Sequence, residues 1–179
     1  MKKLMIASAI AMTMAAGSAM AVTTNMGTQQ NEIQFLGVVT EVTCDIDAVV
    51  DGAVNNVVQL GTVKKGEEGD VKNIVLKAKN PAQCTGLDTV KKATIAFKGP
   101  LGDAGLVNDK GTAEGAVVSL VAKNSETANK AINKTDDIAT FPANLVTGAG
   151  YQFEAKLDAT NATATGTFDS ALAYAVTYQ

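Results

Sequence analysis

The chain of 179 residues contains no histidine, no tryptophan and, among its 15 basic residues, no arginine. Without histidine, a Ser-His-Asp or Cys-His nucleophile system cannot be built in the ordinary way, and the usual histidine ligands of a zinc site are missing. Without arginine, the chain has no basic patch of the kind that binds nucleic acid. The lack of tryptophan removes a common platform for carbohydrate rings. We therefore expect no enzyme, no cofactor, no metal site and no nucleic-acid partner.

The N-terminus has the pattern of a secretory signal peptide. Lys2 and Lys3 form a basic start, residues 4–14 are apolar or small, and residues 19–21 read Ala-Met-Ala, a cleavage signature. The alternative is a buried N-terminal helix, and the apolar run is too short for a convincing membrane span. Cleavage after residue 21 would leave 22–179, a single domain of 158 residues (179 minus 21), with the formal charge moving from −3 to −5. Neither a polybasic segment nor a second long apolar run predicts membrane insertion.

Only two cysteines occur, Cys44 and Cys84. In an exported chain an isolated pair is more often a disulfide than a metal site. We therefore predict a Cys44–Cys84 bridge. Closing a loop of about 40 residues stabilises a fold by ~4 kcal/mol in the chain-entropy model.

The rest of the chain reads as short alternating strands separated by turn signals rather than as helices. The predicted strands cover residues 33–39, 57–60, 74–76, 93–97, 116–121 and 151–157, followed by a terminal strand. Seven or so short strands with no repeat or linker predict a single all-β domain, an antiparallel β-sandwich.

The terminal strand is the most informative segment. From residue 168 onward the even positions carry the large apolar side chains, interrupted only by Ser170, and the sequence printed here ends at Gln179. A strand this apolar needs a neighbour on its open edge, from this chain or from another. Residues 33–39 are a candidate, and two readings remain open for them. They form an internal strand of a complete domain, or they are a strand given to another molecule.

Several segments together resemble the major-type, type 1-like pilin subunits of chaperone–usher fimbriae. Residues 35–39, with Cys44 seven positions after Gly37, resemble the family's N-terminal extension and first cysteine. Tyr178 is the penultimate residue and Gly166 the fourteenth from the C-terminus, as in the family's chaperone-recognition motif. The remaining matching segments are residues 58–61, 74–76 followed by Cys84, 93–99 and 115–120.

The resemblance implies an incomplete immunoglobulin-like antiparallel β-sandwich that lacks its last strand. A neighbouring subunit completes the sandwich with its N-terminal extension, about residues 22–39 here. The side chains of this donor strand would be those of Ile33, Phe35 and Val39, with Gly37 where no side chain fits. The residues implied in chaperone recognition and in the acceptor groove are Gly166, Phe168, Leu172, Tyr174, Val176, Tyr178 and Gln179.

The implied function is structural. The resemblance implies a subunit that passes through the periplasm and polymerises by donor-strand exchange into a surface fimbrium used in bacterial adhesion. The implied partners are identical subunits, a periplasmic chaperone and an outer-membrane usher, with minor or tip subunits and a host-cell receptor as further candidates. In an alternative reading the major subunit is itself the adhesin and binds a host glycan or glycoprotein.

Overall fold

The structure, a computed structural model, describes residues 44–179. The predicted signal peptide and the donor residues Ile33, Phe35, Gly37 and Val39 lie outside the described residues. The described part is almost entirely β-structure. Its elements are β1 (Ile46–Val50), β2 (Ala53–Val54), β3 (Glu68–Ala78), η1 (Pro81–Gln83), β4 (Lys92–Lys98), β5 (Leu101–Gly102), β6 (Gly105–Val107), β7 (Val117–Ala122), β8 (Lys130–Ile132), β9 (Ile138–Pro142), η2 (Ala143–Thr147), β10 (Tyr151–Asp158) and β11 (Ala173–Tyr178).

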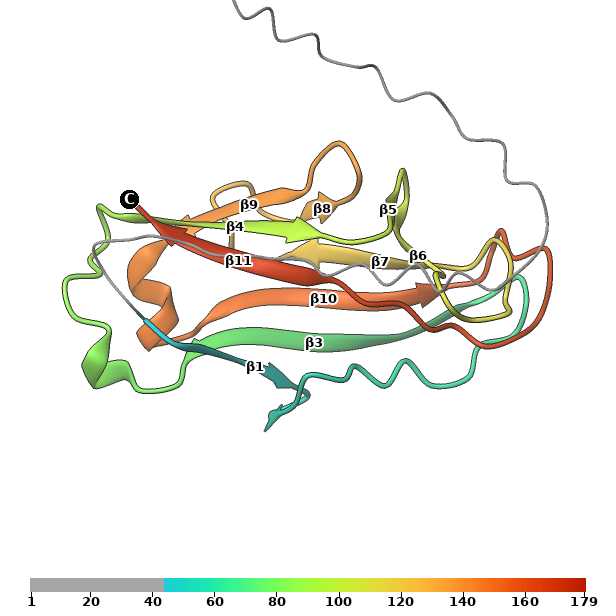
Figure 1. Cartoon of the computed structure of the whole chain (residues 1–179), viewed down its shortest axis with the longest axis horizontal. Helices are drawn as coiled ribbons and strands as arrows, with labels where there is room; N and C mark the ends of the chain where they lie inside the picture. Colours follow the sequence, from blue (N-terminus) through green and yellow to red (C-terminus); the bar gives the residue numbers. More distant parts are fainter. Residues whose placement is uncertain (1–43) are drawn as a thin grey trace, which may run out of the picture. The chain divides into compact units, whose positions relative to one another are not determined.

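These strands form two antiparallel sheets. The larger sheet has the order β2-β1-β3-β10-β7-β6-β5, with β8 also paired to β7, and the smaller has the order β11-β4-β9. Figure 1 shows β11 beside β4, with β10 and β3 in the other layer. The predicted all-β, immunoglobulin-like antiparallel sandwich is confirmed. Within residues 44–179, β11 pairs with β4 alone, so its other edge has no strand partner there.

The core lies between the two sheets and follows from strict alternation in the central strands. Every second residue of β10, from Tyr151 to Leu157, is buried, as a strand with one face on the core requires. Phe97 of β4 packs edge-on against Phe153 of β10 with ring centroids 5.4 Å apart, so the sheets meet through aromatic contacts. The buried Tyr151 hydroxyl donates a hydrogen bond to the Ala143 carbonyl at 3.0 Å, which satisfies its polar end.

Two predicted strands differ from the structure. Residues 57–60 are not part of a sheet, and the terminal strand begins at Ala173 rather than near Phe168. Both segments contain apolar residues that pack on the core, among them Val58, Leu60 and Phe168. The alternation of apolar residues predicts which side chains are buried. A β-strand also requires a neighbouring strand with which its backbone forms hydrogen bonds. For these two segments the described chain supplies no ladder.

The predicted disulfide is present. Cys44 and Cys84 are bonded, with their Cα atoms 4.9 Å apart. The bond joins the residue two positions before β1 to the end of η1, and Cys84 is buried. It therefore ties the start of the described domain to the connection between β3 and β4.

Candidate strand-binding groove

A groove runs between the two sheets at the open edge of β11. It consists of two adjoining cavities of about 490 and 810 Å³. Both cavities are lined by Val57, Val58, Leu60 and Phe168, so they are consecutive parts of one groove. The floor is apolar because core side chains from both sheets line it, including Leu120 and Phe153 of the larger sheet and Phe97 of the smaller.

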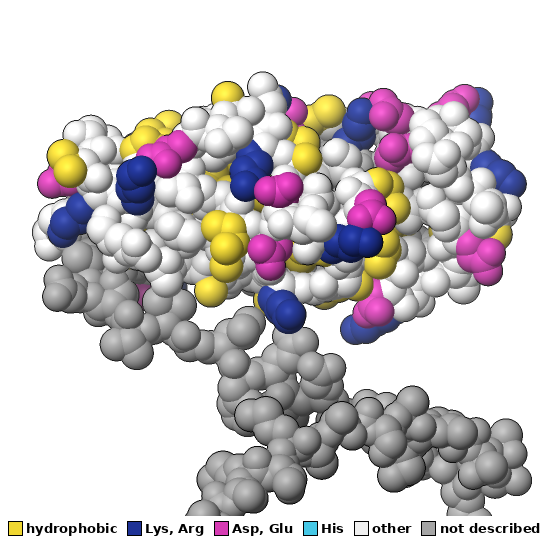
Figure 2. All heavy atoms as spheres, turned by 90° about the horizontal axis from the view of Figure 1, so that it is seen from above, with side chains coloured by type: hydrophobic (Ala, Val, Ile, Leu, Met, Phe, Trp, Pro, Cys, Tyr) yellow, Lys and Arg dark blue, Asp and Glu magenta, His cyan; other side chains and the backbone are white. Residues whose placement is uncertain are grey.

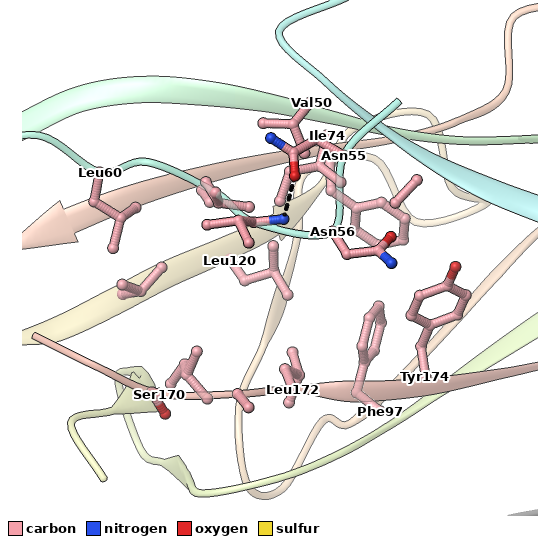
Figure 3. A pocket seen from close by; sticks show the side chains of 18 of the residues that line it. Val50, Asn55, Asn56, Leu60, Ile74, Phe97, Leu120, Ser170, Leu172 and Tyr174 are labelled. Carbon is pink, nitrogen blue, oxygen red and sulfur yellow. Dashed lines mark hydrogen bonds between the residues drawn. The ribbon is translucent and has the colours of Figure 1, made fainter. Parts of the chain in front are cut away.

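Two chain segments form the walls. One is residues 57–63, between β2 and β3; the other is residues 166–174, which lead into β11. We refer to them as the 57–63 wall and the 166–174 wall. Figure 3 shows Asn55, Asn56 and Leu60 on one side of the pocket and Ser170, Leu172, Phe97 and Tyr174 on the other. The groove is therefore bounded along both sides by extended backbone.

The chain supports the 166–174 wall along its outer edge. Residues 166–169 bond to the loop 108–113, for example through the Ala113 amide, which donates to the Thr167 carbonyl at 3.0 Å. At Gly99 an added Cβ would lie 2.8 Å from the Ala171 carbonyl oxygen, so the two backbones are in close contact there. From Ala173 onward β11 pairs with β4. The edge that faces the groove has no backbone partner among the described residues.

The 57–63 wall lacks the hydrogen bonds that support the 166–174 wall. Among the described residues, no hydrogen bond joins the backbone groups of residues 58–63 to any other group. Buried or half-buried backbone groups ordinarily have partners, because an unmade hydrogen bond costs free energy. The groove thus has apolar side chains on its floor and, on both walls, backbone groups without a partner among residues 44–179. A further β-strand satisfies both at once.

The structure brings most of the predicted acceptor residues to this groove. Gly166, Phe168, Leu172 and Tyr174 line it, whereas Val176 and Tyr178 pack on the core farther along β11. Tyr174 is 37 % exposed, although its position in the alternation predicted burial. It stands at the mouth of the groove, where the described chain leaves it partly uncovered.

The two ends of the predicted recognition segment, Gly166 and Gln179, are both tightly placed. A Cβ added at Gly166 would lie 2.6 Å from the Ala113 amide nitrogen, so only glycine allows this approach to the loop 108–113. At the other end the Gln179 amide donates to the Lys92 carbonyl at 2.9 Å, and the Lys92 amide donates to Gln179 O at 2.8 Å. The backbone ladder of β11 therefore continues to the last residue.

The tyrosines of β11 contribute neutral hydroxyl groups. Burial raises the pKa of Tyr178 and, together with the negative charge of Asp47, that of Tyr174. Because the ordinary tyrosine pKa is already about 10, both side chains are protonated at neutral pH. Tyr174 therefore places a polar tip without charge at the groove mouth, whereas the Tyr178 hydroxyl is buried and has no hydrogen-bond partner among the described residues.

The exposed surface gives little indication of another kind of site. On the face shown in Figure 2, lysines lie among aspartate and glutamate side chains rather than in a separate basic cluster. Five ion pairs, such as Lys134–Asp103 at 2.7 Å, occur among the described residues. No group of three or more Cys, Asp or Glu residues within 44–179 is arranged to hold a metal ion. In the same range no helix is long and apolar enough to cross a membrane.

The sequence did not identify the residues that support the groove. Asn55 and Asn56 line its mouth, and Asn108 joins the loop 108–113 to the 166–174 wall. The segment 108–111 carried a turn signal, Asn-Asp-Lys-Gly, and this was the only mark that pointed to it. A turn signal locates a loop but does not show which distant segment the loop binds.

The chain was compared with known families, solved structures and curated proteins. No protein-family model matches the chain. Among solved structures, the P pilus rod subunit PapA covers 83 % of the chain at 16 % identity, with a TM-score of 0.49. The structure of a chaperone–usher pilus covers 88 % of the chain at 16 % identity, with a TM-score of 0.41. Each match spans all of the solved chain. The F107 fimbrial protein of Escherichia coli is 35 % identical over an alignment of 180 positions, which covers all of this chain and all of the F107 protein. The chain therefore belongs to the family of fimbrial proteins that includes the F107 subunit.

Proposed function

We propose that this protein is a structural fimbrial subunit that polymerises by donor-strand exchange. The observation that carries the proposal is the groove, whose floor is apolar and whose two walls lack backbone partners among the described residues. The donor is the N-terminal extension of a second copy, about residues 22–39, with Ile33, Phe35 and Val39 entering the groove and Gly37 between them. The membership of the fimbrial family supports this assignment.

The dimensions and the chemistry of the groove suit such a donor. A wall that runs from Gly166 to Tyr174 spans about 27 Å, because a strand rises 3.2–3.4 Å per residue. The seven residues 33–39 span about 20 Å on the same measure and fit within it. Burial of each Val, Ile or Phe contributes ~1.5–3 kcal/mol, and each net backbone hydrogen bond ~0.5–1.5 kcal/mol. A strand bonded to both walls therefore forms a joint that dissociates very slowly.

The proposal predicts that a free donor strand blocks assembly. Full-chain subunit refolded alone should form multimers that resist denaturant, whereas an excess of a synthetic peptide of residues 22–39 should trap a one-to-one complex. A scrambled peptide of the same composition is the control. Electrophoresis without boiling and native mass spectrometry measure both species. Multimers that form equally well in the presence of the authentic peptide would exclude residues 22–39 as the donor.

We propose that a chaperone strand occupies the same groove before the subunit is assembled into the fimbrium. On its way through the periplasm a chaperone would lend a strand beside β11 and bind the terminal carboxylate of Gln179, and an outer-membrane usher would then exchange that strand for the extension of the next subunit. Gly166 and Tyr178 mark the two ends of this recognition segment. The resulting location is the cell surface, within the fimbrium, with minor or tip subunits as further partners.

Changes at the recognition segment should reduce chaperone capture. Tyr178→Ala removes a ring that packs on the core beside the C-terminus, and Gly166→Val forces the wall away from the loop 108–113. We expect chaperone-bound subunit in the periplasm to fall at least tenfold, the change that ~1.4 kcal/mol produces in an equilibrium constant. Thr177→Ala, on the alternate face of β11, is the control and should be captured normally. Capture of Tyr178→Ala at the wild-type level would remove the recognition role.

The alternative in which the major subunit is also the adhesin, binding a host glycan or glycoprotein, gains no support from the described residues. The two pockets described above are parts of the groove, which the donor strand fills in the proposed assembly. Fibres purified without any minor subunit and tested on host cells separate the two readings. Binding by such fibres would restore the alternative.

A further inference from the structure

Asn108 makes four hydrogen bonds, two within the loop 108–113 and two from this loop to the 166–174 wall. Its Nδ2 donates to the carbonyl oxygens of Ala113 at 2.7 Å and Thr167 at 3.0 Å. Its Oδ1 accepts from the amides of Gly111 at 3.1 Å and Asp169 at 2.9 Å. All the hydrogen-bonding capacity that a side-chain amide commonly uses is thereby engaged, half of it within the loop and half across to the wall.

A second set of contacts holds the same two segments together. The Thr167 amide donates to Thr112 Oγ1 at 3.1 Å, and the Thr112 amide donates to Thr167 Oγ1 at 3.2 Å, which makes a reciprocal pair. The amides of Asp109 and Lys110 both donate to the Asp169 carbonyl, at 3.1 and 2.9 Å.

Two glycines make this close approach possible. A Cβ on Gly111 would lie 2.7 Å from the Thr167 carbonyl carbon, and one on Gly166 would lie 2.6 Å from the Ala113 amide nitrogen. Real side chains do not approach backbone atoms so closely. Both segments therefore carry glycine at the point where their backbones meet.

This arrangement matters because residues 166–169 have no β-ladder to hold them. From Ala173 to Tyr178 the chain is paired with β4 over six residues, but that ladder ends five residues short of Phe168. The wall at residues 166–169 is held by hydrogen bonds from the loop 108–113 to its outer edge. Its inner edge stays available to an incoming strand.

We propose that Asn108 is a positioning residue for strand insertion, which fixes the 166–169 part of the groove wall before the donor strand arrives. The inference rests on the proposed donor-strand exchange. It adds that the Asn108 side chain orders the 166–169 part of the acceptor groove. A wall that is already ordered does not have to be ordered on binding, so insertion is faster when the wall is held in place. Once the donor is bonded along the inner edge, the wall is held from both sides and depends less on Asn108.

The experiment measures insertion of a fluorescent peptide of residues 22–39 into refolded full-chain subunit, with the peptide in excess. In Asn108→Ala we expect insertion to be roughly 10- to 100-fold slower, since the two bonds from Asn108 to the wall are lost. The denaturant midpoint of the completed complex should change much less. Amide hydrogen exchange should accelerate at Thr167 and Asp169 in the free subunit but stay unchanged in β10.

Asn124→Ala is the matched control, because Asn124 also bridges two segments. It donates to the Gly150 carbonyl at 2.9 Å and accepts from the Gln152 amide at 2.8 Å, and it does not line the groove. This variant should lose stability and keep the wild-type insertion rate. Thr112→Val removes the acceptor of the Thr167 amide at an exposed position, so it tests the same contact should Asn108→Ala fail to fold.

The outcomes separate this inference from the proposed function. Failure of the peptide to bind wild-type subunit would overturn donor-strand exchange itself. If the wild type binds the peptide but Asn108→Ala and Thr112→Val take it up at the wild-type rate, only the positioning role is overturned. Equal slowing in Asn124→Ala would likewise overturn it, because general loss of stability would then account for the effect.

Discussion

A full-length subunit that carries Gly37→Arg should fold, bind the chaperone and form no fibres. In the proposed joint, residue 37 faces a groove whose floor is made of apolar side chains such as Ile74, Leu120 and Phe153. An arginine there would bring a charge into an apolar site with no partner, which costs several kcal/mol, as well as a side chain where none fits. A loss of ~4 kcal/mol lowers the association constant about a thousandfold. Electron microscopy of cells and electrophoresis of unboiled samples measure the outcome.

The control for this prediction is Gly27→Arg. Gly27 belongs to the same extension but precedes the alternating stretch 33–39. It should tolerate arginine and assemble normally, so that added charge in the extension is separated from obstruction of the groove. Normal fibres from Gly37→Arg would show that residue 37 does not enter the groove and would reject the donor register. Loss of fibres from both variants would point to charge alone.

Much of the fold could be predicted from the alternation of apolar residues. The strands around residues 93–97, 116–121 and 151–157 appear as β4, β7 and β10 because each buries one face in the core. The disulfide followed from composition, since two cysteines in an exported chain have only one way to pair within the molecule. The strands depend on the alternation of neighbouring residues, and the disulfide depends on the number of cysteines. Both can be read directly from the sequence.

The groove walls could not be predicted in the same way. Residues 57–60 have the pattern of a strand, yet the described chain offers them no partner, because a partner is a property of the whole fold. The same reason explains why the ladder of β11 starts only at Ala173. Tyr174 was expected in the core but is partly exposed at the groove mouth. Burial deduced from alternation assumes that a strand covers both edges of β11, and among the described residues no strand lies on the side of β11 away from β4.

The disulfide and the groove are connected through the edge of the larger sheet. Cys44 lies two residues before β1, and β1 pairs with β3 from Ile46–Ala78 to Val50–Ile74. The Lys79 amide donates to the Asp45 carbonyl at 2.8 Å, which extends this pairing to the residue next to Cys44. Ala48 and Val50 of β1 in turn line the groove. The bond thus secures the strand beside the groove at the start of the described domain.

Replacing Cys44 and Cys84 together by alanine should destabilise the subunit by ~4 kcal/mol, the chain-entropy value for a loop of about 40 residues. Domains of this kind have 5–15 kcal/mol of stability, so a large share would be lost. Urea unfolding of monomeric subunit held by the donor peptide measures the change. The matched control is wild-type subunit treated with a reducing agent, which should lose the same amount, whereas the double variant should not respond to it. A double variant as stable as the oxidised wild type would show that the β1–β3 pairing fixes this edge without the bond.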